Sequence, residues 1–143
     1  MQGLLRIGVD DADGLLAQAL RDPSSAVARA ATQAYTRGGE TLADSTLREA
    51  FDAADNPRLR SRYISLSPLL SKWPRLTFLL ALYGKAVPGE LQLLDRQVDH
   101  WIAKANRSYV QPGEPRRTEL VRSIEELRVI HPAHFWKQLR HLL

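Results

Sequence analysis

Apolar residues recur every three or four positions along most of the chain, which is the period of an amphipathic α-helix. Prolines and glycines divide this pattern into short segments, because proline cannot continue a helix and glycine commonly ends one. The pattern predicts an all-α fold of seven to nine helices joined by short turns. The expected helices are 11–21, 23–37, 45–55, 57–67, 68–73, 74–83, 88–106, 116–130 and 135–142.

The same periodicity predicts which helix faces are buried. Segment 74–83 is apolar on almost every side and is expected to be a central helix. Helix 23–37 is expected to begin behind Asp22 as its N-cap, and helix 45–55 behind Asp44 or Ser45. The predicted buried positions of three helices are Val27, Ala30, Ala31, Ala34 and Tyr35; Leu91, Leu94, Val98, Trp101, Ile102 and Ala105; and Leu120, Ile124, Leu127 and Ile130.

Asp-Pro, Gly-Gly and Asn-Pro turns between short helices are typical of stacked antiparallel hairpins. The stretch Asp22-Pro-Ser-Ser-Ala-Val-Ala-Arg-Ala-Ala31 resembles the turn and second helix of a HEAT repeat, and Asn56-Pro-Arg-Leu-Arg60 is similar. The second copy lacks the alanine face, and Pro68 interrupts its helix. This resemblance, over about residues 11–73, implies a HEAT-like right-handed superhelix. An irregular helical bundle is the alternative.

Length and composition favour one domain over residues 1–143, with a sub-boundary at the 107–115 loop, where two prolines and a glycine cluster. The absence of Cys excludes thiol catalysis, disulfides and Cys-ligated zinc. The apolar stretch 76–83 is far shorter than the ~20 residues that cross a bilayer. The first residues lack the basic and apolar regions of a signal peptide, so a cytoplasmic location is expected.

Charge is unevenly distributed. Residues 1–55 carry nine acidic residues and five Arg, for a net charge of −4, whereas residues 56–143 carry fifteen basic and seven acidic residues, for a net charge of +8. Sixteen of the twenty basic residues are Arg, whose planar group makes bidentate contacts with carboxylates and phosphates. The asymmetry indicates either a surface for nucleic acid or an acidic partner, or two helical layers that attract each other. The preference for Arg over Lys has the alternative explanation of a bias in nucleotide composition.

No sequence motif for catalysis or cofactor binding is present: the chain lacks HExxH, GxxxxGK[ST], GxGxxG and GxSxG. His131 and His134 have a spacing found in metal sites, but Pro132 disturbs the helix that would bring them together, and helix-end capping is the simpler interpretation. Asp95 and Asp99 are expected on a solvated helix face. We therefore expect no enzymatic activity, no metal and no cofactor.

The function predicted from the sequence is a non-enzymatic helical scaffold that binds another protein, acidic in character, through exposed Arg and aromatic residues. The alternative is a nucleic-acid-binding domain that uses an Arg-rich face of residues 56–143. Arg58 and Arg62 are four residues apart and share a helix face, and a second basic cluster begins at Arg116. The candidate contact residues are Arg58, Arg62, Tyr109, Arg116, Arg117 and Arg122.

Overall fold

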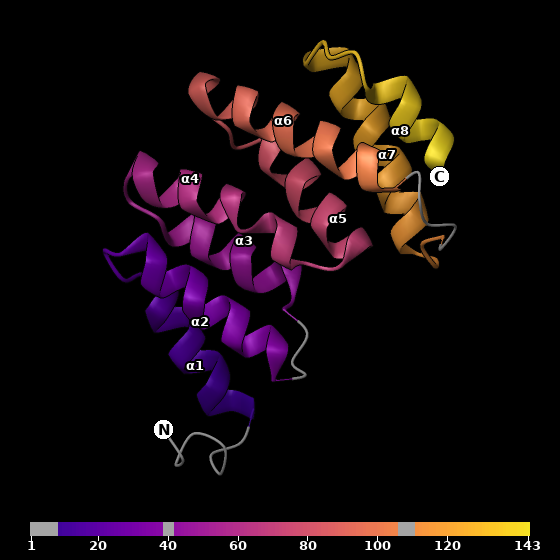
Figure 1. Cartoon of the computed structure of the whole chain (residues 1–143). Helices are drawn as coiled ribbons and strands as arrows, with labels where there is room; N and C mark the ends of the chain where they lie inside the picture. Colours follow the sequence, from indigo (N-terminus) through magenta and orange to yellow (C-terminus); the bar gives the residue numbers. More distant parts are fainter. Residues whose placement is uncertain (1–8, 39–41, 106–110) are drawn as a thin grey trace. The chain divides into compact units, whose positions relative to one another are not determined.

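The computed structural model describes residues 9–38, 42–105 and 111–143, with side chains from residue 14 onward. Within these ranges the chain forms α-helices and one 3-10 helix and no β-strand, which confirms the predicted all-α class (Figure 1). The elements are α1 (Val9–Leu20), α2 (Ser25–Arg37), α3 (Asp44–Ala53), α4 (Pro57–Ser65), η2 (Ser67–Leu69), α5 (Lys72–Tyr83), α6 (Pro88–Ala105), α7 (Arg116–Ile130) and α8 (Trp136–Leu142).

The chain divides into two compact units, Met1–Ser71 and Lys72–Leu143. In the first unit α1 and α2 form one helical hairpin and α3 and α4 form the next, with α1 also packed on α3 (Figure 1). Each hairpin places large apolar side chains out of solvent. The buried residues of this unit include Leu16, Leu20, Leu47, Phe51, Tyr63 and Ile64.

The buried face of α2 differs from the predicted one. Val27 is 45% exposed, whereas Ala28 and Thr32 are completely buried. A threonine is tolerated there because its hydroxyl donates a hydrogen bond of 2.7 Å to the carbonyl of Ala28. Ala30 and Ala34, also expected in the core, are exposed. Alanine buries little apolar area, so a row of alanines only weakly determines which face of a helix packs.

Two predicted helix starts are corrected and one is confirmed. The N-cap of α2 is Ser24, whose hydroxyl accepts a hydrogen bond from the Val27 amide, and Asp22 instead accepts one from the Ser24 amide. Helix α3 begins behind Ala43, with no side-chain cap. Helix α4 begins as predicted, because the Asn56 side chain accepts a hydrogen bond of 3.0 Å from the Leu59 amide and Pro57 follows at the first helical position.

The second unit is built around α5, which packs on α6 and α7, while α8 packs on α6 and α7. Leu76, Phe78 and Leu79 of α5 are completely buried, as expected of a central helix. Ile130 was expected in the core but is 71% exposed, because it is the last residue of α7 and the chain leaves the helix there. None of the helices in the described ranges is both long and apolar enough to span a membrane.

Candidate anion-binding pocket

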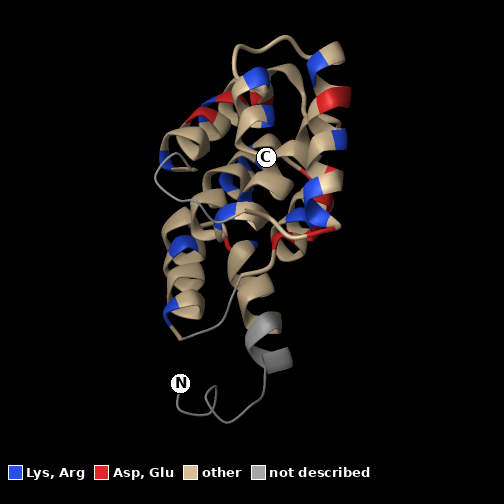
Figure 2. Cartoon of the chain, turned by 90° about the vertical axis from the view of Figure 1, so that its right-hand side faces the viewer, with Lys and Arg blue, Asp and Glu red and all other residues tan. Residues whose placement is uncertain are grey.

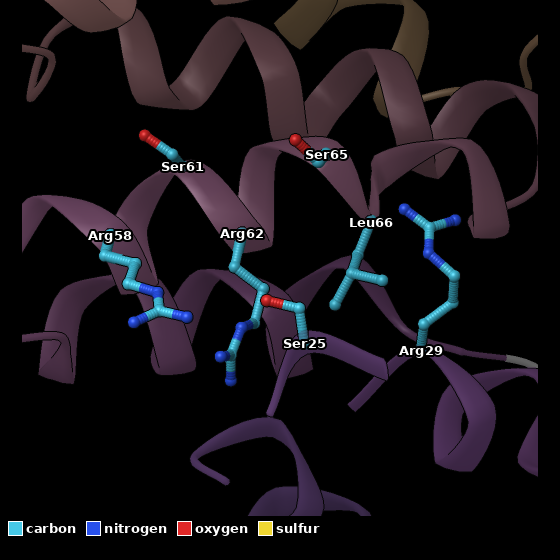
Figure 3. Close-up of a pocket in the computed structure, with 7 residues that line it drawn as sticks. All are labelled: Ser25, Arg29, Arg58, Ser61, Arg62, Ser65 and Leu66. Carbon is cyan, nitrogen blue, oxygen red and sulfur yellow. The ribbon is translucent and has the colours of Figure 1, made fainter. Parts of the chain in front are cut away.

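A pocket of about 280 Å³ lies in the first unit between residues of α2 and α4 (Figure 3). Its lining contains three arginines and three serines and no carboxylate. Arg58 and Arg62 extend from α4 on one side of Ser25, and Arg29 extends from α2 on the other side (Figure 3). The complete lining is Ser25, Arg29, Arg58, Ser61, Arg62, Ser65 and Leu66.

Helical geometry brings the polar lining together. The four polar residues of α4 follow one another at steps of three, one and three positions, which places them on one helix face. The Asn56 cap and Pro57 fix where α4 begins, and Arg58 consequently lies in its first turn. Ser25 is the first residue of α2, and Arg29 follows one helical turn later. The pocket therefore includes the N-terminal turns of two helices.

Arg62 is buried, with 8% of its surface exposed. Its terminal nitrogens donate hydrogen bonds to the carbonyls of Leu20 at 3.1 Å, of Asp22, and of Pro23 at 3.0 Å. The Nε atom is buried and has no hydrogen-bond partner among the described residues. These contacts fasten α4 to the turn between α1 and α2. Carbonyl dipoles stabilise the guanidinium but do not neutralise its charge.

Arg29 and Arg58 are exposed, and the described part of the chain provides no ion pair for either of them. Neither α2 nor α4 has an acidic residue in its first turn. The N-terminus of a helix carries a partial positive charge, so an arginine in the first turn of α4 adds to that charge instead of balancing it. The lining itself therefore provides no carboxylate for its three arginines, and the Asp22 carboxylate beside it accepts a hydrogen bond from the Ser24 amide at the start of α2.

The main-chain oxygen of Leu20 that Arg62 contacts has a second donor. The Tyr63 hydroxyl donates a hydrogen bond of 3.1 Å to the Leu20 carbonyl, the same carbonyl that Arg62 contacts. Burial raises the pKa of Tyr63, and the positive charges of Arg62 and Arg21 act in the opposite direction. Arg21 therefore lies close to Tyr63.

Two of the six predicted contact residues, Arg58 and Arg62, line the pocket. Arg62 lacks the exposure for which it was selected, because it is bonded to the α1–α2 turn. Tyr109 lies outside the described residues. In the second unit, Arg116 donates to the Thr77 hydroxyl at 2.8 Å, Arg117 donates to the Leu143 main-chain oxygen at 2.8 Å, and Arg122 is exposed.

Basic and acidic residues are interspersed within α3, α6 and α7, whereas α2, α4, α5 and α8 contain basic residues alone (Figure 2). The basic cluster that begins at Arg116 belongs to the mixed helices, since α7 also contains Glu119, Glu125 and Glu126. Arg128 forms an exposed ion pair of 3.5 Å with Glu125. Mixed charges of this kind weaken the potential of α7 compared with the pocket on α2 and α4, whose lining contains no acid.

Sequence reasoning missed Leu66 and four polar pocket residues: Ser25, Arg29, Ser61 and Ser65. The two serines of α4 share the helix-face spacing of Arg58 and Arg62, so the periodicity of polar residues was a usable signal. The two residues of α2 depend on which helices pack together, and the local sequence pattern does not contain that information.

Two histidines of the second unit, His131 and His134, each pair with an aspartate of α6. His131 Nε2 lies 3.0 Å from Asp95 Oδ1, and His134 Nε2 lies 3.0 Å from Asp99 Oδ1. The Tyr83 hydroxyl donates a further bond of 2.6 Å to Asp95, which was expected to be fully solvated. No group of three or more metal-ligating side chains occurs in the described ranges. The pairs connect α6 to the segment between α7 and α8.

No model of a protein family matches this sequence, and comparisons with curated proteins and with solved structures find no similar chain. Functional inference therefore depends on the pocket itself.

Proposed function

We propose that this chain is a non-enzymatic protein-interaction module whose first unit, a HEAT-like pair of helical hairpins, binds an anionic segment of a partner protein. The observation that carries the proposal is the arginine pocket, with Arg29 and Arg58 exposed and unpaired among the described residues. Guanidinium groups bind carboxylates and phosphates with two parallel hydrogen bonds, and Arg is enriched in protein interfaces. The cytoplasm stays the predicted compartment.

The geometry also explains how such a segment would be held at small cost. Arg62 is already ordered by its bonds to the α1–α2 turn, so it contributes a fixed positive charge without loss of side-chain entropy on binding. Arg29 and Arg58 have no partner among the described residues, so closing on an anion breaks no existing ion pair. One fixed and two adjustable cations suit segments of differing shape.

Nucleic acid is the alternative partner, since the Arg-rich face predicted within residues 56–143 also suits phosphodiesters. A specific observation in its favour is that each unit has an exposed arginine of this face, Arg58 on α4 in the first unit and Arg122 on α7 in the second. Nucleic-acid binding predicts an affinity that falls steeply and linearly with the logarithm of the salt concentration, because each phosphate contact releases counterions.

The test is fluorescence anisotropy of the full chain with labelled poly-L-glutamate, and separately with a labelled 20-base-pair DNA and a single-stranded RNA. We expect poly-glutamate to bind and Arg58→Gln to lower the affinity about tenfold. The reason is that one hydrogen bond to a charged group contributes about 1.5–3 kcal/mol to the free energy of binding. Arg37→Gln is the matched control, because Arg37 is an exposed arginine of α2 outside the pocket lining. Equal losses in the two variants, or tighter binding to DNA or RNA, would contradict the proposal.

A further inference from the structure

Resting on the proposed function, we further propose that the pocket selects a phosphate monoester, carried by a phosphorylated serine or threonine of the partner segment. The claim concerns the three arginines, Ser25 and Leu66 that line the pocket. It is more specific than affinity for acidic peptides, because it assigns to this pocket one chemical group with two negative charges.

Charge favours the phosphate monoester over a carboxylate. The lining combines three guanidinium groups with no acidic residue. A carboxylate brings one negative charge and two oxygens, whereas a phosphoserine brings about −1.5 to −2 charges and three strong acceptor oxygens. Only the charge of the phosphoserine comes close to neutralising three guanidinium groups. The first turn of α2, which contains no acid, adds the positive end of one helix dipole, whereas the lining follows α4 from its first turn to its C-cap Leu66.

Hydrogen-bond donors remain available in the pocket. Arg29 and Arg58 have no partner among the described residues, and Ser25 presents a hydroxyl at the first position of α2. Arg62 supplies an independent sign that the site is electrostatically incomplete: it is more than nine-tenths buried, its terminal nitrogens meet only neutral carbonyls, and its Nε has no partner in the described ranges. A buried cation without a counter-ion gains from an anion beside it.

Size and apolar lining also suit a phosphorylated side chain. The volume of about 280 Å³ lies just below the range of roughly 300–1,000 Å³ for pockets that enclose whole small-molecule ligands. A single side chain ending in a phosphate is smaller than such a ligand. Leu66 provides an apolar wall, which suits the methylene or methyl group next to the ester oxygen.

Charge over the whole first unit disfavours a polyanion. Met1–Ser71 contains nine acidic residues and eight arginines, for a net charge of −1. A nucleic acid presents one charge per phosphodiester over a long path, and it gains affinity from an extended basic surface. A positive pocket within a unit of negative net charge instead favours an isolated, doubly charged group over a long chain of single charges.

The experiment measures binding of the full chain to three five-residue peptides that carry phosphoserine, glutamate or serine at the centre of four alanines. Titrations by isothermal calorimetry would be combined with NMR detection of the arginine side-chain Nε–H signals. We expect the phosphoserine peptide to bind at least tenfold more tightly than the glutamate peptide, and the serine peptide not to bind. The Nε–H signal of Arg62 is expected to shift on addition of the phosphoserine peptide.

Two variants and a pH series locate the effect. Arg29→Gln and Arg58→Gln are each expected to lower the affinity for the phosphoserine peptide about tenfold, and Arg37→Gln to lower it less than twofold. Circular dichroism is expected to show that all three variants are folded. Affinity is expected to fall below about pH 6, where the phosphate loses its second charge.

The outcomes separate the two proposals. Equal affinity for the phosphoserine and glutamate peptides, with both dependent on Arg58, overturns phosphate selection and leaves anionic-segment binding intact. No binding of either peptide or of poly-glutamate overturns both proposals. Tighter binding of a 20-base-pair DNA than of the phosphoserine peptide, weakened equally by Arg58→Gln and Arg37→Gln, also overturns the inference.

Discussion

Replacing Arg62 by methionine is expected to destabilise the first unit by about 3 kcal/mol. Three hydrogen bonds from a charged donor are lost, each worth about 1.5–3 kcal/mol, although only the bond to Leu20 is fully buried. The carbonyls of Asp22 and Pro23 are part-exposed and regain water, and the Leu20 carbonyl keeps its bond from Tyr63. Removing a buried cation with an unpaired Nε recovers a further part of the loss.

Hydrogen exchange read by mass spectrometry suits this prediction, because it reports the two units through separate peptides. A loss of 3 kcal/mol corresponds to a fall of about a hundredfold in the protection of α1, α2 and α4 amides, at about 1.4 kcal/mol per factor of ten. Arg58→Met on the same helix is the control, and its effect is expected to stay within about 0.5 kcal/mol because Arg58 is exposed. Equal effects in the two variants would refute the structural role of Arg62.

Three further predictions test other parts of the fold. Leu79→Ala in the centre of α5 is expected to lower the free energy of unfolding, measured in urea, by about 2–5 kcal/mol. Val129→Ala, at a position 81% exposed, is expected to change it by less than about 0.5 kcal/mol. Asn56→Ala removes the α4 cap and is expected to cost about 1 kcal/mol, and no loss would contradict the capping role. Burial and the hydrogen bond to Asp95 raise the pKa of Tyr83 above its usual value near 10, so its contribution to stability is present below about pH 10 and is lost above it. Thermal melts from pH 8 to 11 are expected to show this alkaline loss, and Tyr83→Phe to reduce it.

The extent of the fold that could be predicted from sequence depends on the size of the apolar side chains. Leu94, Val98 and Trp101 of α6 are buried as their spacing predicted, because each removes a large apolar area from water. In α2 the competing faces consist mainly of alanine, and packing against α1 decided that Ala28 and Thr32 are buried. Where the side chains are small, the tertiary structure determines which face of the helix is buried.

The candidate site was predictable in part for a similar reason. The spacing of Arg58 and Arg62 placed them on one face of α4, and both line the pocket. Their different roles were not predictable, because exposure depends on how close the α1–α2 turn comes to each of them. The contribution of Ser25 and Arg29 likewise depends on the proximity of α2 to α4, which only the tertiary structure provides.

The contact between Arg62 and the α1–α2 turn has an evolutionary consequence. Its acceptors are the main-chain oxygens of Leu20, Asp22 and Pro23, and substitution of those side chains leaves the oxygens in place. Among homologous chains we expect the arginine to be retained while no position in the turn covaries with it. Methods that infer contacts from covarying positions would therefore not detect this interaction between the second hairpin and the first.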